Sequence, residues 1–260
     1  QIESARRDGL YTPPSLKGSI EFPFTAGGVN WGGAAFDPTT NRLYVNTSSM
    51  LHLITLVPRA ETDEEWHELP YGEQAPMRGA PYAMQRVTLI SPLGVPCNPP
   101  PWGLLHAIDM NSGEVAWESV LGTTEEIAPL GLALHTGTPN LGGPLVTAGG
   151  LVFISATMDY YLRAFDTKTG IELWQGKLPA GGQAGPMSYN YGGRQYVVIA
   201  AGGHKEFQTR KGDYVIAWLA LLRGHRSRTI GAWRAARRAV PHPRPPRPWR
   251  NGRGLARRRP

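Results

Sequence analysis

One short pattern, Ala-x-Asp-x-x-Ser/Thr-Gly-x-x-x-Trp, occurs twice in the sequence. The copies are AIDMNSGEVAW at 107–117 and AFDTKTGIELW at 164–174, and they begin 57 residues apart. The aspartate of each copy can accept hydrogen bonds from turn amides, and the glycine allows the positive φ of a hairpin bulge. A looser relative, AAFDPTTNRLYVN at 34–46, has Asn41 at the glycine position. Repeats of about 50 residues indicate a β-propeller or a solenoid.

The composition between these copies favours short strands joined by turns. The 260 residues include 32 glycines and 24 prolines, which disfavour long helices. Apolar strands with turn signals follow at 143–159, 194–203 and 213–221. A β-sandwich is the alternative, but it does not explain a tryptophan that returns at a fixed place in the repeat. We therefore predict an all-β fold, a partial β-propeller over residues 1–220.

Two stretches interrupt the strand pattern. Residues 60–76 are acidic and indicate a solvated excursion from the propeller. Residues 92–103 are rich in proline, which predicts an extended and rigid loop.

Charge separates the last 40 residues from the rest. The net charge is +7, yet all 20 acidic residues precede residue 221, whereas 13 of the 27 basic residues follow it. This tail, 221–260, is rich in Arg, Pro, Ala and Gly and has no Lys. The composition favours translation of a GC-rich gene in a shifted reading frame over a basic arm that binds nucleic acid or anionic lipid. We expect the tail to be disordered and expect no nucleic-acid partner.

Other residue counts exclude several classes of protein. The single cysteine, Cys97, excludes an internal disulfide framework and a four-cysteine zinc site. No apolar run is long enough to span a membrane. The histidines at 67, 106 and 135 show no spacing typical of metal ligands.

Several long stretches together resemble the C-terminal part of membrane-bound quinoprotein glucose dehydrogenases, which use pyrroloquinoline quinone (PQQ). They include GGVNWGGAAFDPTTNRLYVN, SPLGVPCNPPPWGLLHAIDMNSGEVAW, GTPNLGGPLVTAGGLVFISATMDYYLRAFDTKTGIELW and LPAGGQAGPMSYNYGGRQYVVIAAGG. The resemblance covers about residues 1–218. It implies that the repeat is the tryptophan-docking motif of an eight-bladed propeller. Trp117 and Trp174 then lock neighbouring blades, and Asp109 and Asp166 serve as turn acceptors.

The resemblance also implies what the whole enzyme does. Such an enzyme oxidises D-glucose to gluconolactone with PQQ and Ca²⁺ or Mg²⁺, and it passes the electrons to ubiquinone at the periplasmic face of the bacterial inner membrane. An N-terminal membrane anchor, the catalytic aspartate, an active-site lysine and most metal ligands would lie upstream of this sequence. We therefore expect the chain to be a C-terminal fragment that is inactive alone.

Two glycine-flanked loops are the predicted cofactor contacts. In GGVNWGG, at 27–33, an amide and an indole lie between paired glycines that let a backbone approach a flat molecule. The residues alone fit equally well a tight turn with Trp31 in the core, but the resemblance implies that Asn30 and Trp31 contact PQQ. In TPNLGGP, at 138–144, the resemblance places Leu141 against the quinone, whereas the sequence alone indicates an apolar plug.

Two polar residues are predicted to lie near the chemistry. The resemblance implies that Asp159 supports the active-site lysine by a charge-assisted contact, and without that lysine we expect the carboxylate to have no partner here. The plain alternative is another turn aspartate. His204, in AAGGHKEF, matches the family's rim of the active site, whereas a lone loop histidine is usually solvated.

Two other functions stay open from the sequence. One is a PQQ enzyme for another sugar, polyol or alcohol. The other is a non-catalytic propeller that serves as a binding scaffold. The glycine-lined loops around Asn30 and Leu141 argue against a scaffold, which needs no such pocket.

Overall fold

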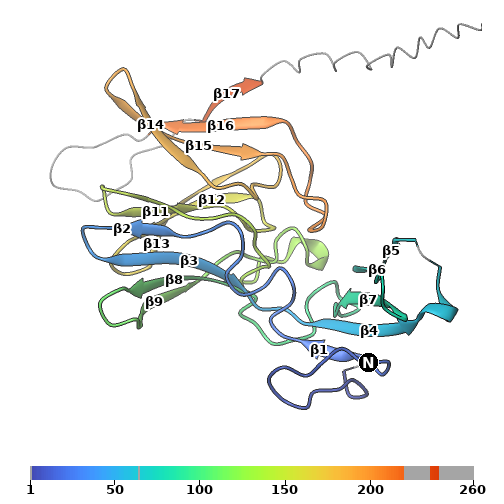
Figure 1. Ribbon diagram of the computed structural model, residues 1–260. Helices are drawn as coiled ribbons and strands as arrows, with labels where there is room; N and C mark the ends of the chain where they lie inside the picture. The colour runs from blue at the N-terminus through green and yellow to red at the C-terminus, as the bar shows by residue number, and fades with distance from the viewer. Residues whose placement is uncertain (1, 64, 220–234, 240–260) are drawn as a thin grey trace, which may run out of the picture.

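The structure is a computed structural model that describes residues 2–63, 65–219 and 235–239. Its strands form four antiparallel sheets, three of which stack face to face as successive blades (Figure 1). The predicted all-β partial propeller is confirmed. In the described part, two short 3₁₀ turns, η1 (Arg59–Glu61) and η2 (Pro129–Gly131), add to the strands, and no helix is long and apolar enough to cross a membrane.

Each blade is a four-stranded up-and-down sheet. The first blade has the order β2 (Ala35–Asp37), β3 (Arg42–Ser48), β8 (Gly103–Asp109), β9 (Val115–Val120). The second has β10 (Leu145–Thr147), β11 (Leu151–Ile154), β12 (Tyr161–Asp166), β13 (Glu172–Lys177). The third has β14 (Met187–Tyr191), β15 (Arg194–Ala201), β16 (Tyr214–Leu219), β17 (Ala235–Ala239).

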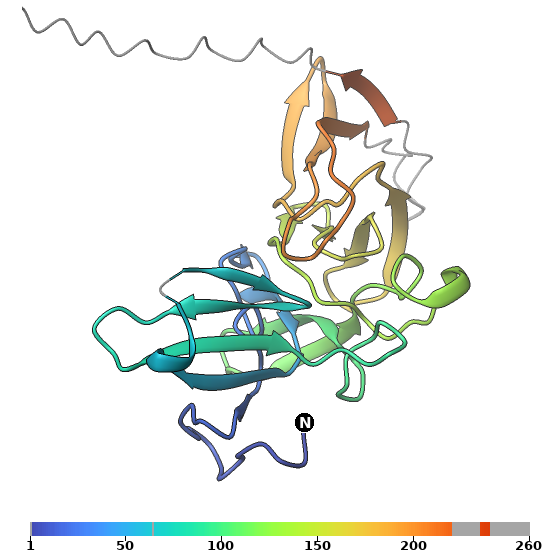
Figure 2. The same cartoon turned by 90° about the vertical axis from the view of Figure 1, so that its right-hand side faces the viewer.

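A fifth of the chain is inserted between β3 and β8 and, together with the N-terminal strand β1, forms the fourth sheet beside the blades, which we call the insertion sheet (Figure 2). Its order is β1 (Ser19–Glu21), β4 (His52–Pro58), β7 (Tyr82–Thr88), β6 (Gly72–Pro76), β5 (His67–Leu69). The expectation of a solvated excursion at 60–76 is therefore wrong in part. β6 pairs with β7, and Arg86 binds the carboxylate of Glu73, so the acidic stretch is held in a sheet.

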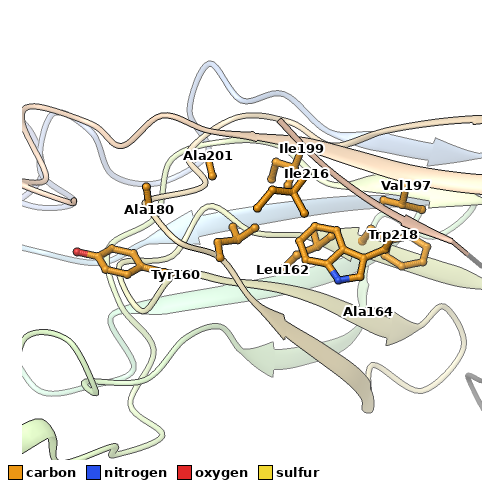
Figure 3. Packing of buried hydrophobic residues seen from close by; sticks show 11 residues of the cluster. Tyr160, Leu162, Ala164, Ala180, Val197, Ile199, Ala201, Ile216 and Trp218 are labelled. Carbon is orange, nitrogen blue, oxygen red and sulfur yellow. The ribbon is translucent and has the colours of Figure 1, made fainter. Parts of the chain in front are cut away.

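Apolar side chains from facing blades form the core. Between the second and third blades, Val197, Ile199 and Ala201 alternate along β15 and meet Leu162 and Ala164 of β12, as Figure 3 shows. This period of two is the pattern of a strand face. A second cluster, centred on Tyr44, Leu105, Val152, Ile154 and Phe165, joins the first blade to the second. The second blade is therefore buried on both of its faces.

The repeated motif forms the turn that the sequence predicts. Backbone amides of Lys168 and Thr169 donate to Oδ1 of Asp166, each at 2.9 Å, and Gly170 has φ 71°. The first copy has the same form, with Asn111 donating its amide to Asp109 at 2.8 Å. Both copies also carry a register shift further along the strand pairing, between Ala107 and Ile108 and between Ala164 and Phe165.

Both tryptophans of the motif dock on the next blade. The indole N–H of Trp117 donates to the backbone oxygen of Thr167 at 3.0 Å, and its ring covers Gly170 so closely that a Cβ there would lie 2.5 Å from it. Trp174 meets Trp218 of β16 edge to face at 5.8 Å between ring centroids. The predicted blade-locking role is present at both positions. The glycine therefore serves both the turn and the docking.

The tail differs from the sequence prediction at one place. Ala235–Ala239 form β17, which pairs with β16, although disorder was expected over 221–260. The open edge of β16 offers unpaired backbone groups that β17 satisfies. Residues 220–234 and 240–260 lie outside the described residues, and so do the predictions made for them.

Candidate functional site

The candidate site residues gather at one end of the blades, opposite the repeated turns. We call this end the site face, and Figure 2 looks onto it. It consists of the loops 27–33, 138–143, 155–160, 181–184 and 203–210. Backbone hydrogen bonds join them, including Ala156 N–H to Gly182 O at 2.9 Å and Gly181 N–H to Arg210 O at 3.0 Å. The sequence predictions at Asn30, Leu141, Asp159 and His204 therefore converge in space.

The two glycine-rich loops touch through their backbones. A Cβ on Gly32 would lie 2.4 Å from the carbonyl carbon of Gly142, and one on Gly143 would lie 1.9 Å from the oxygen of Gly32. No side chain fits there, so glycine is required at both places. This contact brings the predicted cofactor loops of Asn30 and Leu141 together.

Trp31 points outward from its loop. Its side chain is 80% exposed, so it is not a core residue. Its backbone amide donates to Oδ1 of Asn30 at 2.6 Å, and the adjacent Gly33 faces open space with φ +75°. The loop therefore presents an aromatic face and an amide group. The contact of either with a cofactor stays a prediction.

Leu141 is 5% exposed and packs on Phe24, Met50 and Phe207. These four side chains come from separate segments of the chain, so the cluster fixes the site face. The side chain fits the apolar plug that the sequence alone indicated. A contact with the quinone stays a prediction.

Asn140 holds the same loop and was not identified from the sequence. It is 2% exposed, accepts from Nδ2 of Asn46 at 2.6 Å, and donates to the backbone oxygens of Thr47 and Thr138 at 2.9 and 3.1 Å. The sequence feature that could have identified Asn140 is an amide side chain close to two glycines, in PNLGG.

Asp159 is fully buried and has partners in this chain, contrary to the expectation that it has none. Arg163 donates to both carboxylate oxygens, at 3.0 and 2.5 Å. The hydroxyl of Thr157 donates to Oδ1 at 2.6 Å, and the amide of Thr123 donates to Oδ2 at 2.7 Å. Each oxygen thus accepts at least two hydrogen bonds. Support of a lysine from outside this sequence stays a prediction.

The positive charge of Arg163 keeps the carboxylate of Asp159 ionised. Burial raises the pKa of Asp159, but the hydrogen bonds and charge of Arg163 outweigh it and leave the pKa below its ordinary value of 3.8. Arg163 is 1% exposed and also lies 3.2 Å from the carboxylate of Glu172, whose pKa is raised by its own burial. Asp159 is therefore the ionised member of a buried ion pair.

A hydrogen-bond network links Asp159 to His204. Thr157 binds Asp159 through its hydroxyl, and the backbone oxygen of Thr157 accepts from Nε2 of Gln183 at 3.0 Å. Oε1 of Gln183 accepts from the hydroxyl of Thr209 at 3.0 Å, and that hydroxyl accepts from the amide of His204 at 2.8 Å. The carboxylate and the histidine thus belong to one rigid unit.

The imidazole of His204 has an unused nitrogen. The ring lies 5.6 Å from the ring of Phe207, and Nδ1 is buried without a hydrogen-bond partner in the described chain. Buried polar atoms are nearly always satisfied, so this nitrogen is an exception within the described chain. The alternative of a solvated loop histidine does not fit a buried nitrogen.

These features fit part of a PQQ site. The exposed ring of Trp31 and the amide of Asn30 suit a planar molecule that carries carboxylates and a quinone. Among the described residues no group of three or more His, Cys, Asp or Glu could hold a metal ion. A cavity of about 510 Å³ lies elsewhere, on the insertion sheet beside Tyr71, Leu89 and Cys97.

Comparison with known proteins decides the family. The sequence profile of the PQQ-dependent glucose/ethanol/alcohol dehydrogenase β-propeller domain matches residues 1–197. The chain belongs to this family.

Its relatives in the family act on different substrates. It is 44% identical to a probable quinate dehydrogenase (quinone) from Xanthomonas campestris pv. juglandis over 84% of this chain and 29% of the relative. It is 41% identical to the quinoprotein glucose dehydrogenase of Escherichia coli over 82% of this chain and 28% of the relative. It is 39% identical to the glycerol dehydrogenase large subunit of Gluconobacter oxydans over 84% of this chain and 32% of the relative.

The chain thus spans less than a third of the length of these relatives. The family activity, PQQ-dependent dehydrogenation linked to a quinone, agrees with the resemblance seen in the sequence. The relatives divide over glucose, quinate and glycerol, so the substrate is a separate question.

Proposed function

We propose that the chain is the C-terminal part of a quinoprotein glucose dehydrogenase that oxidises D-glucose to gluconolactone at the periplasmic face of the inner membrane. The observation that carries this proposal is the backbone contact between Gly32 and Gly143, which assembles two predicted cofactor loops beside His204. The identity of 41% to the E. coli enzyme supports glucose as the substrate. The electrons pass to ubiquinone.

Each residue of the site face has a role in this proposal. The exposed ring of Trp31 and the amide of Asn30 would hold PQQ, and the half-buried imidazole of His204 would lie at the rim of the site. Bound PQQ, with Ca²⁺ or Mg²⁺, supplies the acceptor for hydride from the substrate carbon. The buried pair of Asp159 and Arg163 keeps the loops fixed, which maintains the geometry that such a transfer needs.

A second candidate is a quinate dehydrogenase. The 44% identity to the Xanthomonas protein favours it, and quinate, unlike glucose, carries a carboxylate. Lys205 and Arg210 are exposed cations on the loop of His204, at 3.9 and 3.8 Å from Glu68 and Glu126, and a substrate carboxylate could compete for them.

The test is a chimera in which residues 1–219 replace the matching part of the E. coli glucose dehydrogenase. After reconstitution with PQQ and Ca²⁺ or Mg²⁺, dye reduction is measured with glucose, quinate and glycerol. We expect turnover of glucose. His204→Ala should lower kcat/KM by about 10- to 100-fold, since a hydrogen bond to a charged group contributes roughly 1.5–3 kcal/mol. The exposed neighbour Glu206→Ala is the matched control and should change it less than about twofold.

The outcomes separate the candidates. Turnover of quinate without turnover of glucose would select the second candidate. A folded chimera that binds no PQQ would support the scaffold alternative and refute both enzymatic proposals.

A further inference from the structure

A surface loop between β9 and β10 exposes three leucines. Every residue of the segment PLGLALH, at 129–135, is exposed, and Leu130, Leu132 and Leu134 are exposed by 105%, 57% and 49%. The segment contains no acidic residue, lysine or arginine. We call it the leucine loop. It projects at the margin of the site face, on the side away from the insertion sheet (Figure 2).

The exposure of these leucines is built into the backbone. The buried hydroxyl of Thr124 donates to the oxygen of Leu132 at 2.5 Å and accepts from the amide of Leu134 at 2.9 Å. The amide of Thr124 also donates to the oxygen of Leu134 at 3.1 Å. Leu130 has φ 61°, a conformation that leucine rarely adopts. One buried threonine therefore holds the loop open instead of letting it collapse on the blades.

The base of the loop is tied to the site. Thr123 donates its amide to the carboxylate of Asp159 at 2.7 Å. Glu125 and Glu126 lie 3.1 and 2.8 Å from Nζ of Lys177, and that nitrogen also donates to the backbone oxygen of Asp159 at 3.1 Å. Lys177 and Arg210, which lies 3.8 Å from Glu126, together compensate these two acidic charges, so the tip has little charge to repel an anionic surface.

The shape and size of the leucine loop indicate which kind of partner it can bind. A specific dimer buries about 800 Å² and about 20–30 residues on each partner. A convex tip with three leucines offers far less. A lipid bilayer needs no complementary shape and accepts an apolar tip at the boundary of its headgroups and acyl chains. Leucines are the side chains that gain from such burial.

We infer that the leucine loop inserts into the surface of a lipid bilayer and turns the site face toward it. The inference rests on the proposed function for its purpose, because a quinone that dissolves in lipid must reach the site face. The binding itself requires no cofactor and no substrate. It can therefore fail, or succeed, independently of the enzymatic proposal.

The first experiment places an environment-sensitive fluorophore on the loop of the 260-residue chain. Cys97→Ser removes the single native cysteine, and Leu132→Cys then carries the NBD label. Ser112→Cys, in an exposed turn at the opposite end of the first blade, is the matched control. Vesicles of phosphatidylcholine with a minority of phosphatidylglycerol should raise and blue-shift the emission at 132 and leave 112 unchanged.

Three results would overturn the inference. They are an emission at 132 that vesicles do not change, an equal change at both positions, and a blue-shifted emission at 132 before vesicles are added. The last result would show that another part of the protein, or a second copy, covers the loop.

The second experiment measures vesicle partition by sedimentation. The variant Leu130→Gln/Leu132→Gln/Leu134→Gln should lower the partition coefficient by about 1000-fold, at roughly tenfold for each leucine. Leu10→Gln/Leu16→Gln/Leu93→Gln is the control, since these leucines are as exposed, by 86%, 57% and 67%. Circular dichroism shows that both variants are folded. An equal loss in the control would mean nonspecific hydrophobic binding and would refute the role of the loop.

Discussion

Replacement of Arg163 by methionine tests the buried ion pair under the site face. The side chains of Arg163 and Asp159 are 1% and 0% exposed, and the variant leaves the carboxylate with only the hydrogen bonds from Thr157 and Thr123. Removal of one partner of a buried pair costs about 3–5 kcal/mol of unfolding free energy, because the remaining charge stays desolvated. Loss of the contact between Arg163 and Glu172 acts in the same direction.

The buried ion pair also predicts the direction in which the unfolding free energy changes with pH. In the wild type, the pKa of Asp159 lies below its ordinary value of 3.8, so its stabilisation is fully present above that value and is lost as the pH falls through the folded pKa. In Arg163→Met, burial acts on Asp159 and Glu172 without the opposing cation and raises both pKa values. The folded variant then binds protons more readily than the unfolded chain. Its stability should therefore rise as the pH falls from neutral toward about 4.

The assay is urea unfolding followed by circular dichroism at several pH values. Arg194→Met, at an exposed position of β15, is the control and should cost less than about 0.5 kcal/mol. The double variant Asp159→Asn/Arg163→Met should be more stable than Arg163→Met, because the fully buried carboxylate of Asp159 is removed. A cost below about 1 kcal/mol for Arg163→Met, or a double variant that is no more stable, would refute the reasoning.

Two further predictions concern the glycine contact and the docking tryptophan. Gly143→Ala places a Cβ 1.9 Å from the oxygen of Gly32 and should abolish PQQ binding in the chimera, measured by fluorescence titration, whereas Gly149→Ala, which meets nothing closer than 3.9 Å, should bind normally. Equal binding by both variants would contradict the role of the contact. Trp117→Phe removes the hydrogen bond to Thr167 and should cost roughly 1–3 kcal/mol in urea unfolding, while a Tm unchanged from wild type would count against docking.

The parts of the fold that the sequence predicts depend on local chemistry. The turn around Asp166 and Gly170 needs residues that are adjacent in the chain, so its pattern is visible without a structure. The docking of Trp117 follows from the same repeat, because each copy must meet the next one. The family resemblance rests on these local patterns too.

Residues that act across the chain were missed for a physical reason. Arg163 lies in β12, which is buried on both faces, so alternation along the strand marks no solvent side. The sequence therefore does not show that Arg163 turns toward Asp159. Likewise, β1 pairs with β4 across 30 intervening residues, and the acidic β6 is ordered by its pairing with β7. Such pairings depend on the whole chain.

Residues 49–102 leave the first blade at the end of β3 and return to it at the start of β8, where the two strands are directly paired. Ser48, the last residue of β3, is in register with Gly103, the first residue of β8, so a short hairpin turn could close the blade in place of residues 49–102. Closing a longer loop costs only about 0.6 kcal/mol for each doubling of its length. The segment is thus an insertion at the site face that the strand ladder of the first blade does not need. Its residues can therefore change without disturbing the pairing of β3 with β8.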